Sequence, residues 1–365
     1  MPKNPNQIKI RLGFFLTLGS TSKSKLLTMR WLFLFIPLIL SFSACQSQEK
    51  ETNNNKTSIF DWLSAREELV HLEIKGDLTH LFVDRHGTDH YHSAKITMNR
   101  GDSTKQMKIE IARRGVTRKK ICDFPPIKLK FPKKTLAKQG LAKHNNYKLV
   151  THCMEGEDDL VLKEYLTYKL FNQLSDNSFQ VKLAKIRYLD DSGEVPDDTH
   201  YAFLIEDNKE LASRLNGKIL NAEKFKLTRV DKDQYKKMVL FQYMIGNTDW
   251  NLSKGHNIKW IQPKDSETPI PVPYDFDYCG LVNADYAVPH PQIPIRSVRE
   301  RFLQWRGKNK EELLPVCDAF KSLKPNFFKT CMEFEYLNAA TKEDMIAFLD
   351  SYFEEVEKEI RMQKS

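Results

Sequence analysis

The chain lacks three features that would each place it in a familiar class of protein. None of its six cysteines shows the CxxC spacing of a zinc-binding motif. No GxGxxG loop is present, and the basic stretch that begins at Arg113 contains a single glycine, Gly115. The apolar run at residues 32–42 is shorter than the roughly 20 residues that a membrane-spanning helix needs. These absences exclude a CxxC zinc site, a glycine-loop nucleotide site and a comfortable membrane span.

The segment before Cys45 has the order of an export signal. Residues 29–31 are a short basic start, the apolar run follows, and small residues lead directly to the cysteine. A cysteine in this position resembles the lipidation box of bacterial lipoproteins. We predict a leader and signal peptide over residues 1–44, with Met29 as the initiator. Lipidation of Cys45 would then anchor an exported protein to a membrane, in the periplasm or at the cell surface. A simple N-terminal membrane anchor is the alternative.

A polar segment follows the predicted lipidation site and is too poor in apolar residues to fold alone. We therefore predict a lipidated flexible tether over residues 45–58. The rest of the chain is long enough for one large or two modest cores. We expect a β-rich N-terminal lobe over 59–206 and a mainly helical C-terminal lobe with catalytic-type loops over 207–365. Five cysteines remain beyond Cys45, and because five is odd, at least one of them is expected to stay free or to bond elsewhere.

The formal net charge is +9, and its most concentrated part is the basic stretch over residues 113–120, which continues to Lys134. Nucleic acid is not an expected partner of an anchored, exported protein. The stretch instead suggests a nucleotide or other phosphorylated ligand, or an anionic glycan. A solvated basic face is the alternative.

Apolar periodicity changes from a strand-like to a helix-like spacing along the chain. Strands are predicted near residues 80–84, 93–98, 106–112, 127–131, 147–150, 181–189, 201–205 and 257–261. A mostly buried helix is predicted over 159–174. Asp231 and Gln234 have the spacing of a capping box for a helix that Gly246 ends, and Thr341 is the predicted cap of a C-terminal helix. Strands around one helix, followed by a helical half, predict an α+β protein with the two-lobe layout of protein kinases.

Acidic and amide residues in the second half have an order typical of phosphoryl transfer. Asp249 follows the capped helix, Asn257 opens a predicted strand, and Asp275 and Asp277 lie in the sequence Tyr-Asp-Phe-Asp. In this layout the first acid orients the acceptor hydroxyl, while the amide and the second acid hold Mg²⁺ on the phosphates. Asn251 competes with Asn257 for the amide role. Ordinary turn residues are the alternative reading of the whole set.

A physical argument also favours a metal. If Asp275 and Asp277 alternate on one face of a strand, their like charges repel unless a cation pairs with them. Carboxylate oxygens suit Mg²⁺ or Mn²⁺. His86, His90 and His92 lie in a turn rich in Gly and Asp, and we interpret them as surface histidines of a hairpin.

These segments together resemble the spore-coat-protein-H (CotH) family of atypical kinases. The resemblance rests on residues 128–131, 148–150, 160–174, 203–206, 246–257 and 274–280, while the part from Ala287 onward resembles uncharacterised exported lipoproteins of the bacteroidete type. It implies phosphoryl transfer from ATP, with Mg or Mn, to a protein or glycan acceptor. The nucleotide-binding residues that it implies are Lys148 with Glu164 as its helix partner, Lys128 and Lys130 as competing lysines, and Glu206 at the adenine-contacting linker.

Two other function classes remain open at this point. Exported compartments hold little ATP, so a pseudokinase that acts as a binding module is one of them. The other is a carbohydrate-processing protein that uses Asp249 with Asp275 or Asp277 as a carboxylate pair.

Overall fold

The structure is a computed structural model that describes residues 56–66, 69–82, 90–115, 117–221 and 229–362. The predicted leader and signal peptide, the lipidation site Cys45, most of the tether and His86 lie outside these residues. The expected domain boundaries at residues 58 and 206 stay predictions. Among the described helices, none combines the length and the apolar character that a membrane crossing requires.

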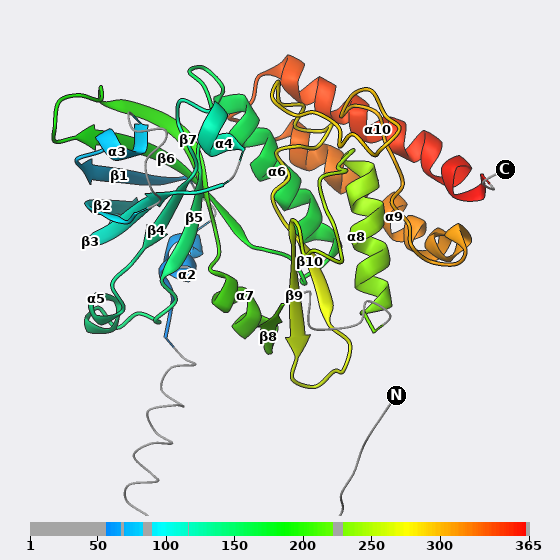
Figure 1. Ribbon diagram of the computed structural model, residues 1–365, viewed down its shortest axis with the longest axis horizontal. Helices are drawn as coiled ribbons and strands as arrows, with labels where there is room; N and C mark the ends of the chain where they lie inside the picture. Colours follow the sequence, from blue (N-terminus) through cyan, green and yellow to red (C-terminus); the bar gives the residue numbers. More distant parts are fainter. Residues whose placement is uncertain (1–55, 67–68, 83–89, 116, 222–228, 363–365) are drawn as a thin grey trace, which may run out of the picture. The chain divides into compact units, whose positions relative to one another are not determined.

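Seven strands form a closed barrel, which Figure 1 shows in blue to green. They are β1 (Val70–Gly76), β2 (His92–Arg100), β3 (Ser103–Arg113), β4 (Ile127–Lys130), β5 (Asn146–Val150), β6 (Val181–Asp190) and β7 (Asp198–Ile205). Their order is β1-β2-β3-β4-β5-β7-β6, and β1 closes the barrel by pairing with β6 in parallel. All other neighbours are antiparallel.

This closure overturns the two-lobe kinase layout that the sequence predicts. The chain does mix helices and strands, but its strands form a barrel in which β1 is paired on both edges. Pairing of every barrel strand on both sides protects the sheet against pairing with other chains. The prediction was wrong because the sequence pattern locates strands but does not say which of them pair.

Alternation of side chains along β1 shows how the barrel forms its own core. Val70, Leu72 and Ile74 are buried, whereas His71 and Lys75 are exposed and Glu73 is half-buried. Period-2 alternation of this kind puts one set of side chains inside the barrel and the other in solvent. Apolar side chains from the other strands and from α2 (Ile59–Ser64) complete this core, among them Ile96, Met98, Ile109, Ile127, Leu129, Tyr147, Ile186 and Leu204.

A second core forms where helices pack beside the barrel. Its main elements are α6 (Asp158–Leu174), α8 (Lys232–Met244), α9 (Leu314–Met332) and α10 (Ala339–Arg361). A three-stranded sheet of order β10-β9-β8 adjoins them, made of β8 (Gly217–Leu220), β9 (Ile258–Pro263) and β10 (Ile270–Pro273). The short helices are α3 (Thr79–Phe82), α4 (Arg118–Ile121), α5 (Lys133–Lys138), α7 (Asn208–Arg214) and the 3-10 turn η2 (Lys310–Leu313).

Most local predictions hold, and the exceptions are informative. The predicted strands within β2 to β7 and β9 and the predicted helix at α6 are confirmed. Asp231 caps α8 by accepting a hydrogen bond from Gln234 N at 2.8 Å. The predicted strand at 80–84 is wrong in its described part, which is the helix α3. Thr341 is not the cap of α10, because Asn338 caps it and accepts from Thr341 N.

One disulfide joins Cys122 to Cys153, which lie 31 residues apart. It ties the segment after α4 to the loop after β5. Cys279, Cys317 and Cys331 are free and buried, as expected for cysteines that pack as small apolar side chains.

Candidate functional site

A cavity of about 350 Å³ collects the acidic and amide residues that the sequence singled out. Asp249, Asn257, Asp275 and Asp277 all line it, together with Lys148 from β5. The remaining lining residues are Arg114, Gly115, Thr117, Arg118, Pro126, His256, Lys259, Tyr274 and Tyr278. Segments far apart in the sequence therefore meet here: the β3–β4 connection, β5, the loop after α8, and the ends of β9 and β10.

A sharp turn after α8 delivers Asp249 to the cavity. Gly246 has a φ of +65°, and a side chain there would lie only 3.0 Å from the Val298 carbonyl oxygen. A glycine is required because it has no Cβ to meet that carbonyl or to oppose a left-handed backbone. The chain then turns back on itself, since Asn251 and His256 exchange two backbone hydrogen bonds of 3.0 Å.

This turn places the side chains of Asn257 and His256 on the carboxylate of Asp249. Asn257 Nδ2 donates to Asp249 Oδ2 at 3.0 Å and to the Asp249 carbonyl at 2.8 Å. His256 Nε2 lies 2.9 Å from Asp249 Oδ1, and this hydrogen bond raises the pKa of the imidazole. Both carboxylate oxygens are thus held. Asn257 has a φ of +54°, a left-handed conformation that asparagine tolerates better than most residues. Asn251 does not line the cavity, and its side chain accepts from Lys254 N instead.

Asp275 and Asp277 do not lie on a strand, contrary to the expectation. β10 ends at Pro273, and Asp275 adopts a φ of +67°. Tyr168 on α6 holds this turn because its hydroxyl accepts from Asp275 N at 2.8 Å. Phe276 is fully buried and packs on Tyr168, with ring centroids 4.6 Å apart. Burial of the Phe276 ring therefore orients the side chains of Asp275 and Asp277 toward the cavity. A non-glycine residue held at positive φ by its surroundings is a frequent property of functional sites.

Glu164 on α6 completes a cluster of three carboxylates. Oxygen atoms of Glu164, Asp275 and Asp277 all lie within 4.8 Å of one another. Burial raises the pKa of Glu164 and of Asp277, and repulsion from neighbouring carboxylates raises both further. Glu164 Oε1 is buried without a hydrogen-bond partner among the described residues. Three hard oxygen donors, one of them unsatisfied, fit Mg²⁺ or Mn²⁺.

Two arginines of the basic stretch face this cluster. Arg118 Nη1 lies 3.8 Å from Glu164 Oε2 and 4.0 Å from Asp277 Oδ2. Arg114 Nη2 lies 3.7 Å from Asp275 Oδ1. The basic stretch was noticed in the sequence, but nothing in its pattern marked these two arginines as the ones that face the acids. His256 was also missed, because its role depends on the turn that returns it to Asp249.

Lys148 lies in the cavity without the ion pair that the resemblance implied. In the described part of the chain, Lys148 and Glu164 form no ion pair, and Arg118 is the cation beside Glu164. Lys148 Nζ has no hydrogen-bond partner among the described residues and lies 4.0 Å from the centroid of the Tyr274 ring. Burial and, next in effect, the nearby Arg114 together lower the pKa of Lys148 to about 7. An unpaired buried ammonium group of this kind is suited to an anionic ligand.

The other three residues implied by the resemblance lie outside the cavity lining. Lys130 pairs with Glu110 at 2.7 Å on the outside of the barrel. Lys128 is exposed, and its ammonium lies 5.9 Å from the Tyr91 ring. Glu206 is buried against Arg214 at 2.6 Å, and its backbone N–H donates to the Gln180 carbonyl. These contacts make Glu206 part of the fold and leave its N–H unavailable to a base.

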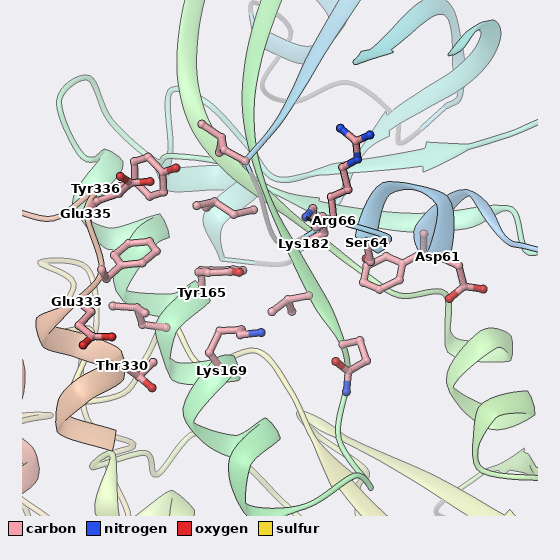
Figure 2. A pocket seen from close by; sticks show the side chains of 17 residues that line it. Asp61, Ser64, Arg66, Tyr165, Lys169, Lys182, Thr330, Glu333, Glu335 and Tyr336 are labelled. Carbon is pink, nitrogen blue, oxygen red and sulfur yellow. Dashed lines mark hydrogen bonds between the residues drawn. The ribbon is translucent and has the colours of Figure 1, made fainter. Parts of the chain in front are cut away.

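A second cavity, of about 570 Å³, lies against a different face of α6 (Figure 2). Tyr165 and Lys169 of α6 line one part of it, and Thr330 and Glu333 at the end of α9 lie nearby. Its lining mixes both signs of charge and includes none of the predicted site residues. The candidate active site is therefore the first cavity, lined by Asp249, Asp275 and Asp277, which is called the carboxylate cavity below.

Comparisons with known proteins add little to this geometry. No family model matches the chain, and no curated protein matches it in sequence. Among solved structures, the crystal structure of the Helicobacter pylori proinflammatory kinase CtkA is similar over 62% of this chain and 89% of that chain, with 10% sequence identity and a TM-score of 0.37. The resemblance to the spore-coat-protein-H family stays a prediction, and the assignment of a function depends on the site itself.

Proposed function

We propose that this protein transfers a phosphoryl group from a nucleotide, bound with Mg²⁺ or Mn²⁺, to an acceptor hydroxyl. The observation that carries the proposal is that carboxylates and basic side chains meet in one cavity. Asp249, Asp275 and Asp277 line it, with Glu164 beside the last two, and four basic residues line the same space: Arg114, Arg118, Lys148 and Lys259. Metal and phosphate together need this combination, because carboxylates hold the metal while cations bind the phosphate oxygens.

Asp249 is the residue suited to orient the acceptor hydroxyl. It is half-buried on the cavity wall, and its two oxygens are fixed by Asn257 and His256. A carboxylate held in this way can accept a hydrogen bond from the hydroxyl and take its proton as the new bond forms. Its own partners ensure that the side chain does not turn away.

Arg114, Arg118 and Lys148 are the residues suited to hold the phosphates. Each of them lines the cavity, and the arginines already lie beside carboxylates. Guanidinium groups bind phosphate with two parallel hydrogen bonds, which fixes its orientation. The metal would be held by Glu164, Asp275 and Asp277 and would supply neutralisation of charge on the phosphates.

The acceptor and the setting belong to the same proposal. The resemblance to the spore-coat-protein-H family implies a protein or glycan acceptor. We also propose export and anchoring through lipidated Cys45, which the signal-like segment before it supports. The disulfide between Cys122 and Cys153 agrees with an oxidising compartment, because stable disulfides are rare in reducing ones.

The direct test is nucleotide binding and transfer by purified protein that begins after the signal segment. ATP with Mg²⁺ or Mn²⁺ should raise the thermal midpoint, and either component alone should do less. Asp249→Asn should keep that shift but lose transfer of labelled γ-phosphate, whereas Asp275→Asn should lose both. Asp102→Asn, in the exposed turn between β2 and β3, is the matched control and should behave as wild type.

Two outcomes would redirect the proposal. If ATP raises the thermal midpoint without metal and no phosphate is transferred, the protein would be a nucleotide-binding module. Arg118, rather than a metal, would then neutralise the carboxylates. A wild-type protein unaffected by every combination of nucleotide and metal would contradict the proposed function.

A further inference from the structure

A second cluster of metal-ligating side chains lies outside the carboxylate cavity, and the proposed function does not use it. His152 follows β5, Asp158 opens α6 and His200 is on β7. One ligand atom from each lies within 4.8 Å of the other two. None of the three lines the carboxylate cavity. The cluster therefore joins two barrel strands to the first turn of α6.

The distances within the cluster suit a tetrahedral ion. His200 Nδ1 lies 3.1 Å from Asp158 Oδ1. Ligand atoms that are each about 2.0 to 2.1 Å from a tetrahedral ion lie roughly 3.3 Å apart. The observed spacing of this pair therefore matches one edge of such a site. The ligand atom of His152 lies within 4.8 Å of both atoms and would have to move closer to complete it.

His200 forms ion pairs with Asp158 and Asp198, and His152 beside them has a nitrogen that these pairs leave unsatisfied. His152 is only 3% exposed, and its Nδ1 is buried without a hydrogen-bond partner among the described residues. Its ring stacks on that of His200, with centroids 3.5 Å apart. A buried imidazole nitrogen with no partner is costly, and a metal ion would satisfy it. On the other side of His200, Nε2 contacts Asp198. Metal-bound histidines commonly donate their second ring N–H to a carboxylate in this way.

We propose that His152, Asp158 and His200 bind one Zn²⁺ ion, with Asp198 orienting His200 from outside the ligand shell. Two imidazole nitrogens and one carboxylate are the donors that Zn²⁺ favours, whereas Mg²⁺ and Ca²⁺ prefer oxygen alone. The side chain of Asp158 is 30% exposed, so an ion can reach the site from solvent. Three protein ligands leave a fourth position for water.

The loop between β5 and α6 explains what the ion would do. The Thr151 carbonyl accepts a hydrogen bond from Arg118, His152 is a ligand, and Cys153 forms the disulfide. The ion would fix the start of α6 to this loop. Because Glu164 is farther along the same helix, the ion would also set the position of the carboxylate beside Arg118.

The test measures the metal directly and does not depend on catalysis. Purified protein is stripped with EDTA, dialysed, and titrated with Zn²⁺ or, as a spectroscopic probe, Co²⁺. Because the carboxylate cluster can also bind these ions, the stoichiometry is read in Asp277→Asn protein. There we expect one ion per chain, a higher thermal midpoint, and the intense visible absorption of tetrahedral Co²⁺. His152→Ala and His200→Ala should each weaken binding by at least about 100-fold. Asp198→Asn should weaken it about 10- to 100-fold, as loss of an orienting carboxylate does. His71→Ala, at an exposed position of β1, is the control.

Two further variants keep the test decisive. Asp277→Asn removes a ligand of the carboxylate cluster, so Zn²⁺ that this variant still binds belongs to the histidine cluster. A failure of the proposed phosphoryl transfer therefore leaves this inference untouched. Asp158→Asn can still accept a hydrogen bond from His200 and should fold even if the histidine variants do not, yet bind Zn²⁺ more weakly. Wild-type protein without stoichiometric binding, or Zn²⁺ binding unchanged in all the ligand variants, would overturn the proposal.

Discussion

Replacing Asp277 with asparagine should stabilise the protein in the absence of metal and remove its response to metal. Asp277 is buried, and oxygens of Asp275 and Glu164 lie within 4.8 Å of its carboxylate. A buried carboxylate beside other carboxylates is held at a cost to stability unless a cation is bound. Residues that destabilise the fold but are needed for ligand binding are typical of functional sites.

The size of the effect follows from the pKa. Burial and the neighbouring Asp275 raise the pKa of Asp277 from 3.8 to about 6. Because the folded-state pKa is raised, the contribution of this group to stability is fully present below pH 3.8 and is lost as the pH rises through about 6. At pH 8 the ionised carboxylate therefore costs up to about 3 kcal/mol, from about 1.4 kcal/mol per pKa unit. An asparagine at this position would avoid that cost, and Glu164 would remain as a partner for Arg118.

Urea unfolding at pH 4 and pH 8, with and without Mg²⁺ or Mn²⁺, is the assay. In EDTA, Asp277→Asn should gain up to about 3 kcal/mol over wild type at pH 8 and much less at pH 4. Added metal should stabilise wild type and leave the variant unchanged. Asp102→Asn again serves as the control. The Tyr286 hydroxyl donates a hydrogen bond to Asp277 Oδ2 at 3.2 Å, and Arg118 lies 4.0 Å from the same oxygen. A loss of stability at pH 8 without metal would refute the reasoning, because these two partners would then stabilise the carboxylate more than burial and repulsion destabilise it.

Three other predictions concern the fold that supports the site. Burial raises the pKa of Glu210 from 4.5 to about 7, so its contribution to stability is lost as the pH rises through that range. In denaturant unfolding, Glu210→Gln should be more stable than wild type by up to about 3 kcal/mol at pH 8 and little changed at pH 4. Phe276→Ala should lower the free energy of unfolding by about 3 to 5 kcal/mol. It should also abolish stabilisation by nucleotide, because the ring that packs on Tyr168 holds the turn carrying Asp275 and Asp277. Phe276→Leu should retain more of the stability and of the nucleotide response, and nucleotide binding by the alanine variant equal to that of wild type would contradict this role. Replacing both Cys122 and Cys153 by serine opens the loop that the disulfide closes over a separation of 31 residues. The free energy of unfolding, measured with heat or urea, should fall by about 3 to 4 kcal/mol. An unchanged stability would show that the disulfide does not constrain the unfolded chain.

Local elements of the fold were readable because their causes are local. Alternation of apolar and polar side chains identifies β2, β3 and β4, and the helix-like spacing of apolar residues identifies α6. Asp231 was a recognisable helix cap because its side chain needs only the N–H three residues later. The same reasoning failed at α3, where a short apolar run fits either a strand or a helix turn.

The identities of the acids in the candidate site were also readable from residue types and order. Asp249, Asn257, Asp275 and Asp277 were chosen from the sequence, and they line one cavity. Their catalytic and metal-binding roles stay predictions.

Long-range pairing was decided only by the tertiary structure. The sequence pattern indicates which side of a strand is buried, but it does not show that β1 pairs with β6 and closes a barrel. For the same reason it did not separate Lys148, which faces the cavity, from Lys130, which pairs with Glu110 outside it. Arg118 became the partner of Glu164 only when the β3–β4 connection folded over α6. Amino-acid types determined which chemistry was possible, and contacts between segments distant in the sequence decided which of those residues share a site, because burial and charge pairing depend on what lies opposite each side chain.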